Sequence, residues 1–228
     1  MNGRIVVVDD VAAAFSQLIA DTVAEQRRGS FSLAFSGGST ARSCYERLAA
    51  DHGGSIDWSA FVGWWGDERC VPLDDDDSNF RLVDEALLSR VGAFNEVHPM
   101  RCDIDDAAET YEEFVRSAPP LDVIHLGLGP DGHTASLFPE SRGLDAPTGR
   151  LVVLNTDPLG NNPHDRLTFT FEGIARGRRT IVTVAGDTKR AAFQRVLDGD
   201  RSAPATRIDG EDVIWLVDPM AMGTESDR

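Results

Sequence analysis

Cysteine, long apolar runs and positive charge are all scarce in this sequence. Its three cysteines, Cys44, Cys70 and Cys102, lie far apart without C-x-x-C spacing, so we expect neither a disulfide framework nor a zinc site. Isolated cysteines of this kind are typical of a reducing cytoplasm. No run of about 18 apolar residues occurs, and we therefore expect no membrane span. Because residues 4–8 read as a strand, we also expect no secretory signal at the N-terminus.

Lysine is almost absent. The chain carries 22 basic and 38 acidic residues, a net charge of −16, and Lys189 is its one lysine. This charge disfavours nonspecific binding to nucleic acid or to anionic membranes, so we expect neither as a partner. An anionic small molecule would require a local group of cations, and Lys189 is the first candidate for such a group.

Short β-branched or apolar runs alternate with helical patterns along the chain. The predicted strands are 4–8, 31–35, 61–65, 121–126, 151–155, 166–171, 180–185 and 213–217, and the predicted helices are 11–23, 40–50, 80–90, 105–117 and 190–197. This alternation predicts an α/β fold with a mainly parallel sheet flanked by helices, Rossmann-like, in one domain over residues 1–228. We expect the strand at 213–217 to close the sheet, and the strand at 166–171 to be half exposed.

The segment 121–139 combines an apolar strand, a glycine-rich turn and a histidine. Residues 121–126 read as a buried parallel strand, and the chain then turns at 127–132. His133 follows at the start of a predicted short helix that Pro139 ends. Because ligands bind at the carboxyl ends of strands in an open α/β sheet, this turn lies where chemistry is expected.

Three interpretations of this turn compete. Gly127, Gly129 and Gly132 match the G-x-G-x-x-G pattern of dinucleotide-binding turns, although the proline and aspartate between the last two leave little room for a pyrophosphate. The turn could also be purely structural. The third interpretation is a catalytic His133 oriented by the neighbouring Asp131, and the other strand ends favour it.

Those strand ends carry groups suited to an anionic ligand. After the strand at 31–35, a glycine turn presents backbone amides at a helix start, and its candidate residues are Gly37, Gly38, Ser39 and Thr40. Asp67 and Arg69 follow the next strand, Lys189 follows the strand at 180–185, and Arg166 begins its own strand. Carboxyl ends of parallel strands lie at one sheet edge, so this set predicts acid–base chemistry on a phosphorylated small molecule. No G-x-S-x-G occurs, which disfavours a serine hydrolase.

With these segments assembled, the sequence resembles the 6-phosphogluconolactonases. The segments that carry the resemblance are 36–39, 66–72, 77–79, 129–139, 166–168 and 185–189. Cys70 departs from the family pattern, where an aromatic is common, and Glu140 stands where glycine is usual. The resemblance implies hydrolysis of 6-phospho-D-glucono-1,5-lactone to 6-phosphogluconate in the oxidative pentose phosphate pathway, without a metal or redox cofactor.

The family also implies a fold shared with glucosamine-6-phosphate deaminases, which are the nearest alternative. Their Asp-Gly-His continues into Ile-Ala-Phe-Asn-Glu-Pro, whereas residues 131–139 here read Asp-Gly-His-Thr-Ala-Ser-Leu-Phe-Pro. Their Asp-Glu-Tyr corresponds to Asp-Glu-Arg at 67–69. Both differences favour the lactonase. A sugar-phosphate-binding module without catalysis is a further alternative, which the presence of His133 and Lys189 disfavours.

The reaction assigns a role to each candidate residue. Neutral His133 can accept a proton from water as it attacks C1 of the lactone, with either Asp131 or Asp67 orienting the imidazole. Arg69 is a candidate for stabilising the oxyanion or for holding the substrate. The phosphate would be held by Lys189, Arg166 and the amides of Gly38 and Ser39. We expect a monomer in the cytoplasm, with a phosphorylated sugar lactone as its small-molecule partner.

Overall fold

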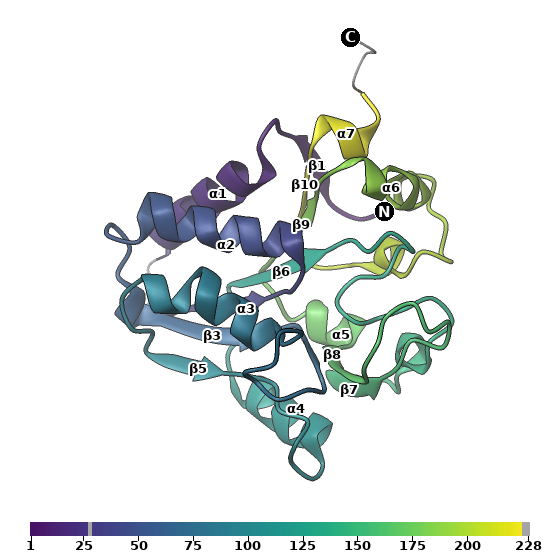
Figure 1. Ribbon diagram of the computed structural model, residues 1–228, viewed down its shortest axis with the longest axis horizontal. Helices are drawn as coiled ribbons and strands as arrows, with labels where there is room; N and C mark the ends of the chain where they lie inside the picture. The colour runs from purple at the N-terminus through teal and green to yellow at the C-terminus, as the bar shows by residue number, and fades with distance from the viewer. Residues whose placement is uncertain (27–28, 225–228) are drawn as a thin grey trace.

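A parallel β-sheet forms the centre of the molecule (Figure 1). The structure is a computed structural model and describes residues 1–26 and 29–224. In spatial order the strands are β1 (Arg4–Val7), β10 (Val213–Val217), β9 (Arg179–Val184), β6 (Val123–Gly127), β2 (Phe31–Phe35), β3 (Phe61–Trp65) and β5 (Glu96–His98). All neighbouring pairs are parallel, which confirms the predicted sheet. The short strand β5 was not predicted, and β1 rather than β10 forms the edge.

Helices flank this sheet, as the alternating pattern predicts. They are α1 (Val11–Glu25), α2 (Ser39–His52), α3 (Asn79–Ala86), α4 (Ala107–Ser117), α5 (Phe171–Ile174), α6 (Arg190–Leu197) and α7 (Pro219–Met222), with 3₁₀ turns at Trp58–Ala60, Leu88–Arg90, Arg142–Asp145, Asp187–Lys189 and Pro204–Arg207. Helices α1, α2 and α3 lie side by side (Figure 1). Among the described residues, no helix is long and apolar enough to cross a membrane.

A second, antiparallel sheet lies beside the carboxyl end of β3. It consists of β4 (Asp67–Arg69), β8 (Arg166–Phe169) and β7 (Val152–Asn155). The expectation of a half-exposed strand at 166–171 is wrong, because all four residues of β8 are buried. The side chain of Thr168 meets the loop after β6, where the backbone N–H of Ser136 donates to its Oγ1 at 3.1 Å.

The predicted helix between His133 and Pro139 is also wrong. Residues 134 and 137 form an isolated antiparallel bridge, and Ala135 has φ +46°, outside the right-handed helical region. The hydroxyl of Thr134 donates back to the carbonyl of Gly127 at 3.0 Å, which folds the chain onto the strand it has just left. A local side-chain bond therefore competes successfully with helix formation here.

The three cysteines do not behave as expected. Cys70 and Cys102 form a disulfide between the end of β4 and the connection from β5 to α4, 32 residues apart in sequence. The expectation of no disulfide is therefore wrong, because two cysteines 32 residues apart meet through the tertiary fold, which cysteine spacing does not reveal. Cys44 is free and buried in the core.

Candidate active site

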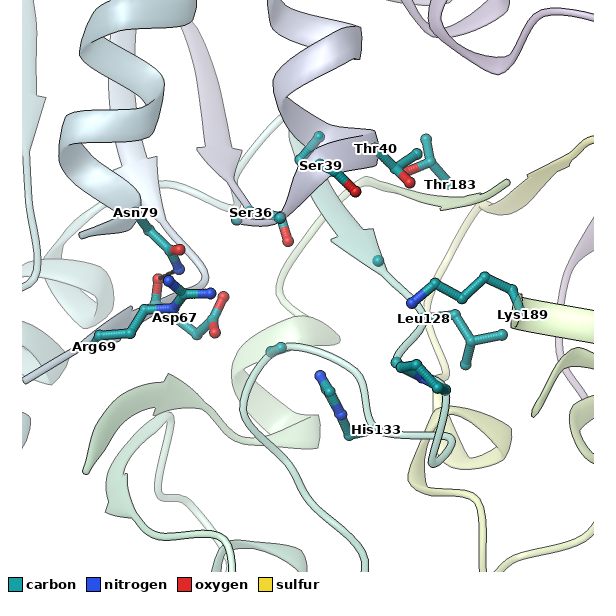
Figure 2. Close-up of a pocket in the computed structure, with 17 residues that line it drawn as sticks. Ser36, Ser39, Thr40, Asp67, Arg69, Asn79, Leu128, His133, Thr183 and Lys189 are labelled. Carbon is teal, nitrogen blue, oxygen red and sulfur yellow. Dashed lines mark hydrogen bonds between the residues drawn. The ribbon is translucent and has the colours of Figure 1, made fainter. Parts of the chain in front are cut away.

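The strand-end loops converge on one pocket at the carboxyl edge of the parallel sheet (Figure 2). Eight predicted residues line it: Gly37, Gly38, Ser39, Thr40, Asp67, Arg69, His133 and Lys189. Asp131 and Arg166 do not line it directly, but each lies against a residue that does. The remaining lining residues include Asn79 and Thr183, which were not predicted.

The wall contributed by β2 and α2 is built for an anion. Gly38 has φ +91° and ψ 169°, which turns the chain into α2 without a side-chain cap on the first amides of the helix. A Cβ on Gly37 would overlap the side chain of Asn79, so only glycine fits between β2 and α3. The free N–H groups and the helix dipole then favour a negative group beside Ser39 and Thr40.

His133 has a carboxylate partner. Its Nδ1 lies 2.6 Å from Oδ1 of Asp131, and its backbone N–H donates to the same oxygen at 3.0 Å. Burial of Asp131 opposes ionisation, but the hydrogen bond and charge attraction of His133 outweigh it, so the pKa of Asp131 is lowered. Asp67 makes a different contact, since its Oδ2 accepts from the hydroxyl of Ser136 at 2.7 Å. Of the two carboxylates considered, Asp131 is therefore the one that contacts the imidazole.

Glu68 anchors the loop that carries Arg69, a feature that the sequence interpretation missed. Its carboxylate is buried and accepts from the backbone amides of Arg69, Asn79 and Phe80, each at 2.7 Å, and from the hydroxyl of Ser78 at 3.1 Å. Burial raises the pKa of Glu68, and the three backbone hydrogen bonds oppose that rise. The strand β4 and the start of α3 are thus held together by one side chain.

Two arginines lie opposite each other on neighbouring strands of the antiparallel sheet. Arg69 on β4 pairs in register with Arg166 on β8. Arg69 faces the pocket and donates to the carbonyl of Asp77. Arg166 is buried behind it and donates to the carbonyl of Pro163 at 2.7 Å. Burial, and then repulsion by Arg69, lower the pKa of Arg166.

Lys189 supplies the charge on the opposite wall. It ends the 3₁₀ turn after β9, and its ammonium points into the pocket between the walls that carry Ser36 and His133 (Figure 2). Burial lowers the pKa of Lys189, and the nearby carboxylate of Asp131 partly opposes this. The pocket therefore combines a helix start, an ammonium and a guanidinium, which together suit a ligand bearing phosphate.

Asn79 and Thr183 were missed for reasons that the structure makes clear. Asn79 Nδ2 donates to the carbonyl of Asp67 at 2.8 Å, so its place in the site depends on the antiparallel sheet. Thr183 lies inside a buried strand, where threonine gives no functional signal in sequence. In residues 1–26 and 29–224, no three His, Cys, Asp or Glu side chains are grouped so that they could hold a metal ion.

These features define an α/β protein with a pocket suited to an anion and a histidine–aspartate pair at the strand ends. A family model described as glucosamine-6-phosphate isomerases/6-phosphogluconolactonase matches residues 5–215. The chain belongs to this family.

Several relatives carry a more specific name. The chain is 36% identical over 216 residues to a 6-phosphogluconolactonase from Synechocystis sp., covering 88% of this chain and 87% of the relative. It is 35% identical over 227 residues to a 6-phosphogluconolactonase from Mycobacterium tuberculosis, covering 91% of each. Against a GDH/6PGL endoplasmic bifunctional protein from Oryctolagus cuniculus the identity is 37% over 194 residues, and this chain spans only 23% of that longer protein.

Solved structures give the same picture. A 6-phosphogluconolactonase from Thermotoga maritima superposes with a TM-score of 0.83 at 29% identity, covering 95% of this chain and 100% of that one. A monomeric glucosamine-6-phosphate deaminase superposes with a TM-score of 0.84 at 19% identity, covering 99% and 100%. The second likeness shows the fold alone, and it confirms the expectation that the fold is shared with deaminases.

Proposed function

We propose that the protein hydrolyses 6-phospho-D-glucono-1,5-lactone to 6-phosphogluconate. The observation that carries this proposal is the His133–Asp131 pair, with Nδ1 and Oδ1 2.6 Å apart, facing a pocket whose other walls hold an anion-binding turn and Lys189. The named relatives support the substrate, since they are 6-phosphogluconolactonases at 35–36% identity. The reaction belongs to the oxidative pentose phosphate pathway.

The chemistry requires one proton acceptor and one oxyanion stabiliser. A six-membered lactone is an activated ester, so water can attack C1 directly. Nε2 of His133 takes the water proton, and the carboxylate of Asp131 stabilises the imidazolium that forms. Arg69 stabilises the oxyanion at C1 or holds the lactone beside it. When the bond from C1 to the ring oxygen breaks, that oxygen takes the proton from the imidazolium, and 6-phosphogluconate is released.

The phosphate lies at the opposite end of the pocket in this proposal. Ser39, Thr40 and Lys189 line that end, where the start of α2 adds unpaired amides. Asp67 accepts a hydrogen bond from Ser136 and so positions the segment that follows His133, which is a different role from orienting the imidazole. Arg166 acts from behind Arg69, so its contribution to binding is indirect.

We also propose that residues 1–228 form one domain that acts as a monomer in the cytoplasm. The Cys70–Cys102 disulfide calls for a direct check of the compartment. Trapping free thiols in cells and measuring whether this pair is reduced or oxidised provides that check.

The decisive experiment is incubation with freshly made 6-phosphogluconolactone, following acid release against the spontaneous rate. We expect rapid, enzyme-dependent acid release. The same preparation is incubated with glucosamine 6-phosphate while ammonia is measured, and none is expected. Stoichiometric ammonia without lactone hydrolysis would reassign the protein to the deaminases, and 6-phosphogluconate binding without any turnover would make it a non-catalytic sugar-phosphate-binding module.

A further inference from the structure

A buried chain of hydrogen bonds links the anion-binding turn to a residue of β9 that also lines the pocket. The backbone N–H of Ser36 donates to the phenol oxygen of Tyr45 at 2.8 Å. That oxygen lies 2.8 Å from Nδ1 of His125, and Nε2 of His125 lies 2.9 Å from Oγ1 of Thr183. All four residues are buried, and Ser36 and Thr183 also line the pocket. None of the roles proposed above uses Tyr45, His125 or Thr183.

The surroundings keep His125 neutral. It lies on β6, and the ring of Phe15 from α1 packs on it with centroids 4.3 Å apart. The ring of Tyr45 meets it edge-on at 5.4 Å. Burial lowers the pKa of His125 to about 3, so at neutral pH the imidazole carries one N–H donor and one acceptor nitrogen. A neutral imidazole carries a proton on only one of its two nitrogens. If Nδ1 accepts a hydrogen bond from one hydroxyl group, Nε2 must therefore donate one to the other.

The bond lengths favour one direction. Tyr45 already accepts from Ser36, so its single proton can go to Nδ1 of His125 at 2.8 Å or to the carbonyl of Ser36 at 3.3 Å. The shorter bond assigns that proton to Nδ1 of His125. Nε2 then carries the ring proton and donates to Thr183. The hydroxyl of Thr183 accepts this hydrogen bond and keeps its own proton to donate elsewhere. Thr183 lines the pocket beside Thr40 (Figure 2).

We propose that Thr183 is a further substrate-binding residue that donates a hydrogen bond to the anionic end of the ligand. Tyr45 and His125 are positioning residues that act only by directing its proton. This inference rests on the proposed function, in which the anionic end is the phosphate of the lactone held by Ser39, Thr40 and Lys189.

The same strand offers a matched control. Thr180 is buried on β9 like Thr183, but its hydroxyl has no hydrogen-bond partner among the described residues, and Thr180 does not line the pocket. Thr183→Val removes the proposed donor with little change in volume, Thr183→Ser keeps it, and Thr180→Val removes a hydroxyl from the same strand. Binding of 6-phosphogluconate and of inorganic phosphate is measured by calorimetry, alongside KM for phosphorylated and unphosphorylated gluconolactone.

A donor to a charged group predicts a clear pattern. Thr183→Val should weaken 6-phosphogluconate binding by about 10- to 150-fold. Thr183→Ser and Thr180→Val should bind like wild type, and KM for the unphosphorylated lactone should not change in any variant. Unchanged 6-phosphogluconate binding in Thr183→Val would overturn the inference. Equal losses on both lactones would overturn it as well, because they would place Thr183 away from the phosphate.

The direction of the chain has its own spectroscopic test. In ¹⁵N-labelled protein, two-bond ¹H–¹⁵N correlations show which nitrogen of a neutral histidine carries the proton, and the five histidines of the chain are few enough to assign. We expect His125 to be protonated at Nε2 at neutral pH. Protonation at Nδ1 would reverse the chain and overturn the assignment of Thr183 as a donor. This measurement uses wild-type protein, so it does not depend on a core variant that folds.

Positioning variants complete the test. His125→Leu breaks the chain, and it should weaken 6-phosphogluconate binding while kcat on the unphosphorylated lactone is kept. His125→Gln can accept from Tyr45 and donate to Thr183, so it should restore much of the binding. The binding assays need no turnover, which separates the two proposals: 6-phosphogluconate binding through Thr183 without lactone hydrolysis would refute the proposed function and leave this inference intact.

Discussion

Nδ1 of His133 and Oδ1 of Asp131 lie 2.6 Å apart, and the carboxylate also accepts the backbone N–H of His133 at 3.0 Å. One aspartate therefore fixes both the ring and the main chain of the proposed base. Since Nδ1 faces the carboxylate, Nε2 is the nitrogen available to a water molecule in the pocket. This arrangement gives His133 and Asp131 distinct and separable contributions.

Replacing these two residues tests the proposed mechanism. His133→Ala should lower kcat by about 10²–10⁴, the usual contribution of a general base. Asp131→Asn should also lower kcat, because a neutral amide cannot stabilise an imidazolium. The double variant should be no worse than His133→Ala, since Asp131 acts through the imidazole. Steady-state hydrolysis of 6-phosphogluconolactone, corrected for the spontaneous rate, measures all three.

A control variant keeps this comparison specific. His52 is a polar residue at the end of α2, outside the pocket, and His52→Ala should keep wild-type kcat. A folded His133→Ala protein with wild-type turnover would remove His133 as the base. Fully additive losses in the double variant would show that Asp131 acts independently of the imidazole.

Lys189 should make the affinity for a phosphorylated ligand fall at alkaline pH. Burial lowers the pKa of its ammonium below the ordinary value of 10.5, so the charge is lost at a lower pH than for an exposed lysine. Affinity for 6-phosphogluconate should accordingly fall as the pH rises through this lowered pKa. Lys189→Arg should bind more weakly at neutral pH, because the planar fork needs more room, but it should lack the alkaline fall. Calorimetric titration across pH 7 to about 10.5 measures both.

The orientation of the substrate can be tested with the same residue. Lys189→Ala should lower kcat/KM on the phosphorylated lactone by about 10- to 150-fold, the cost of losing a charge-assisted hydrogen bond. The loss should shrink sharply on unphosphorylated gluconolactone. Equal losses on both lactones would place Lys189 at the reacting end and reverse the proposed orientation.

The disulfide should contribute to stability through the unfolded chain. A cross-link between residues 32 apart is expected to stabilise the folded state by about 3–4 kcal/mol in the loop-entropy model. The double variant Cys70→Ser, Cys102→Ser should lose that amount in urea unfolding, and dithiothreitol should lower wild-type stability to the same value. Cys44 is an internal control, because burial raises the pKa of its thiol and keeps it unreactive. Equal stability with and without reductant would show that the bond does not form in solution.

The parallel core of the fold could be predicted from sequence because its signals are local. Buried strands such as Val213–Val217 are continuous apolar runs, and α2 starts at a glycine turn after one of them. The antiparallel sheet could not be predicted in the same way. The burial of β8 depends on a loop 32 residues away in sequence, whose Ser136 amide donates to Thr168. The helix expected after His133 fails for a related reason, since the Thr134 side chain bonds back to β6.

In the candidate site, too, local signals could be predicted from sequence and contacts between distant elements could not. Residues such as Lys189 and His133 could be proposed because charged or titratable groups at strand ends are recognisable one loop at a time. The anchoring role of Glu68 and the presence of Thr183 in the pocket could not, because both depend on partners from other elements. Glu68 meets the first turn of α3, and Thr183 meets His125 across two neighbouring strands. Sequence patterns of this kind find the groups that face a ligand more readily than the groups that hold them in place.

His125 should also leave a signature in the pH dependence of stability. Its folded-state pKa is lowered by burial from 6.5 to about 3, so between these values the unfolded chain binds the proton that the folded protein excludes. The stabilisation is therefore complete above pH 6.5 and is lost as the pH falls, by about 1.4 kcal/mol per unit. From pH 7 to pH 5 this amounts to about 2 kcal/mol.

His125→Gln has no such proton, so the difference in unfolding free energy between wild type and variant should shrink by about that amount over this interval. Urea unfolding at both pH values measures it, with His52→Gln as the control that should follow wild type. A difference that stays constant with pH would show that His125 is as readily protonated in the folded protein as in the unfolded chain.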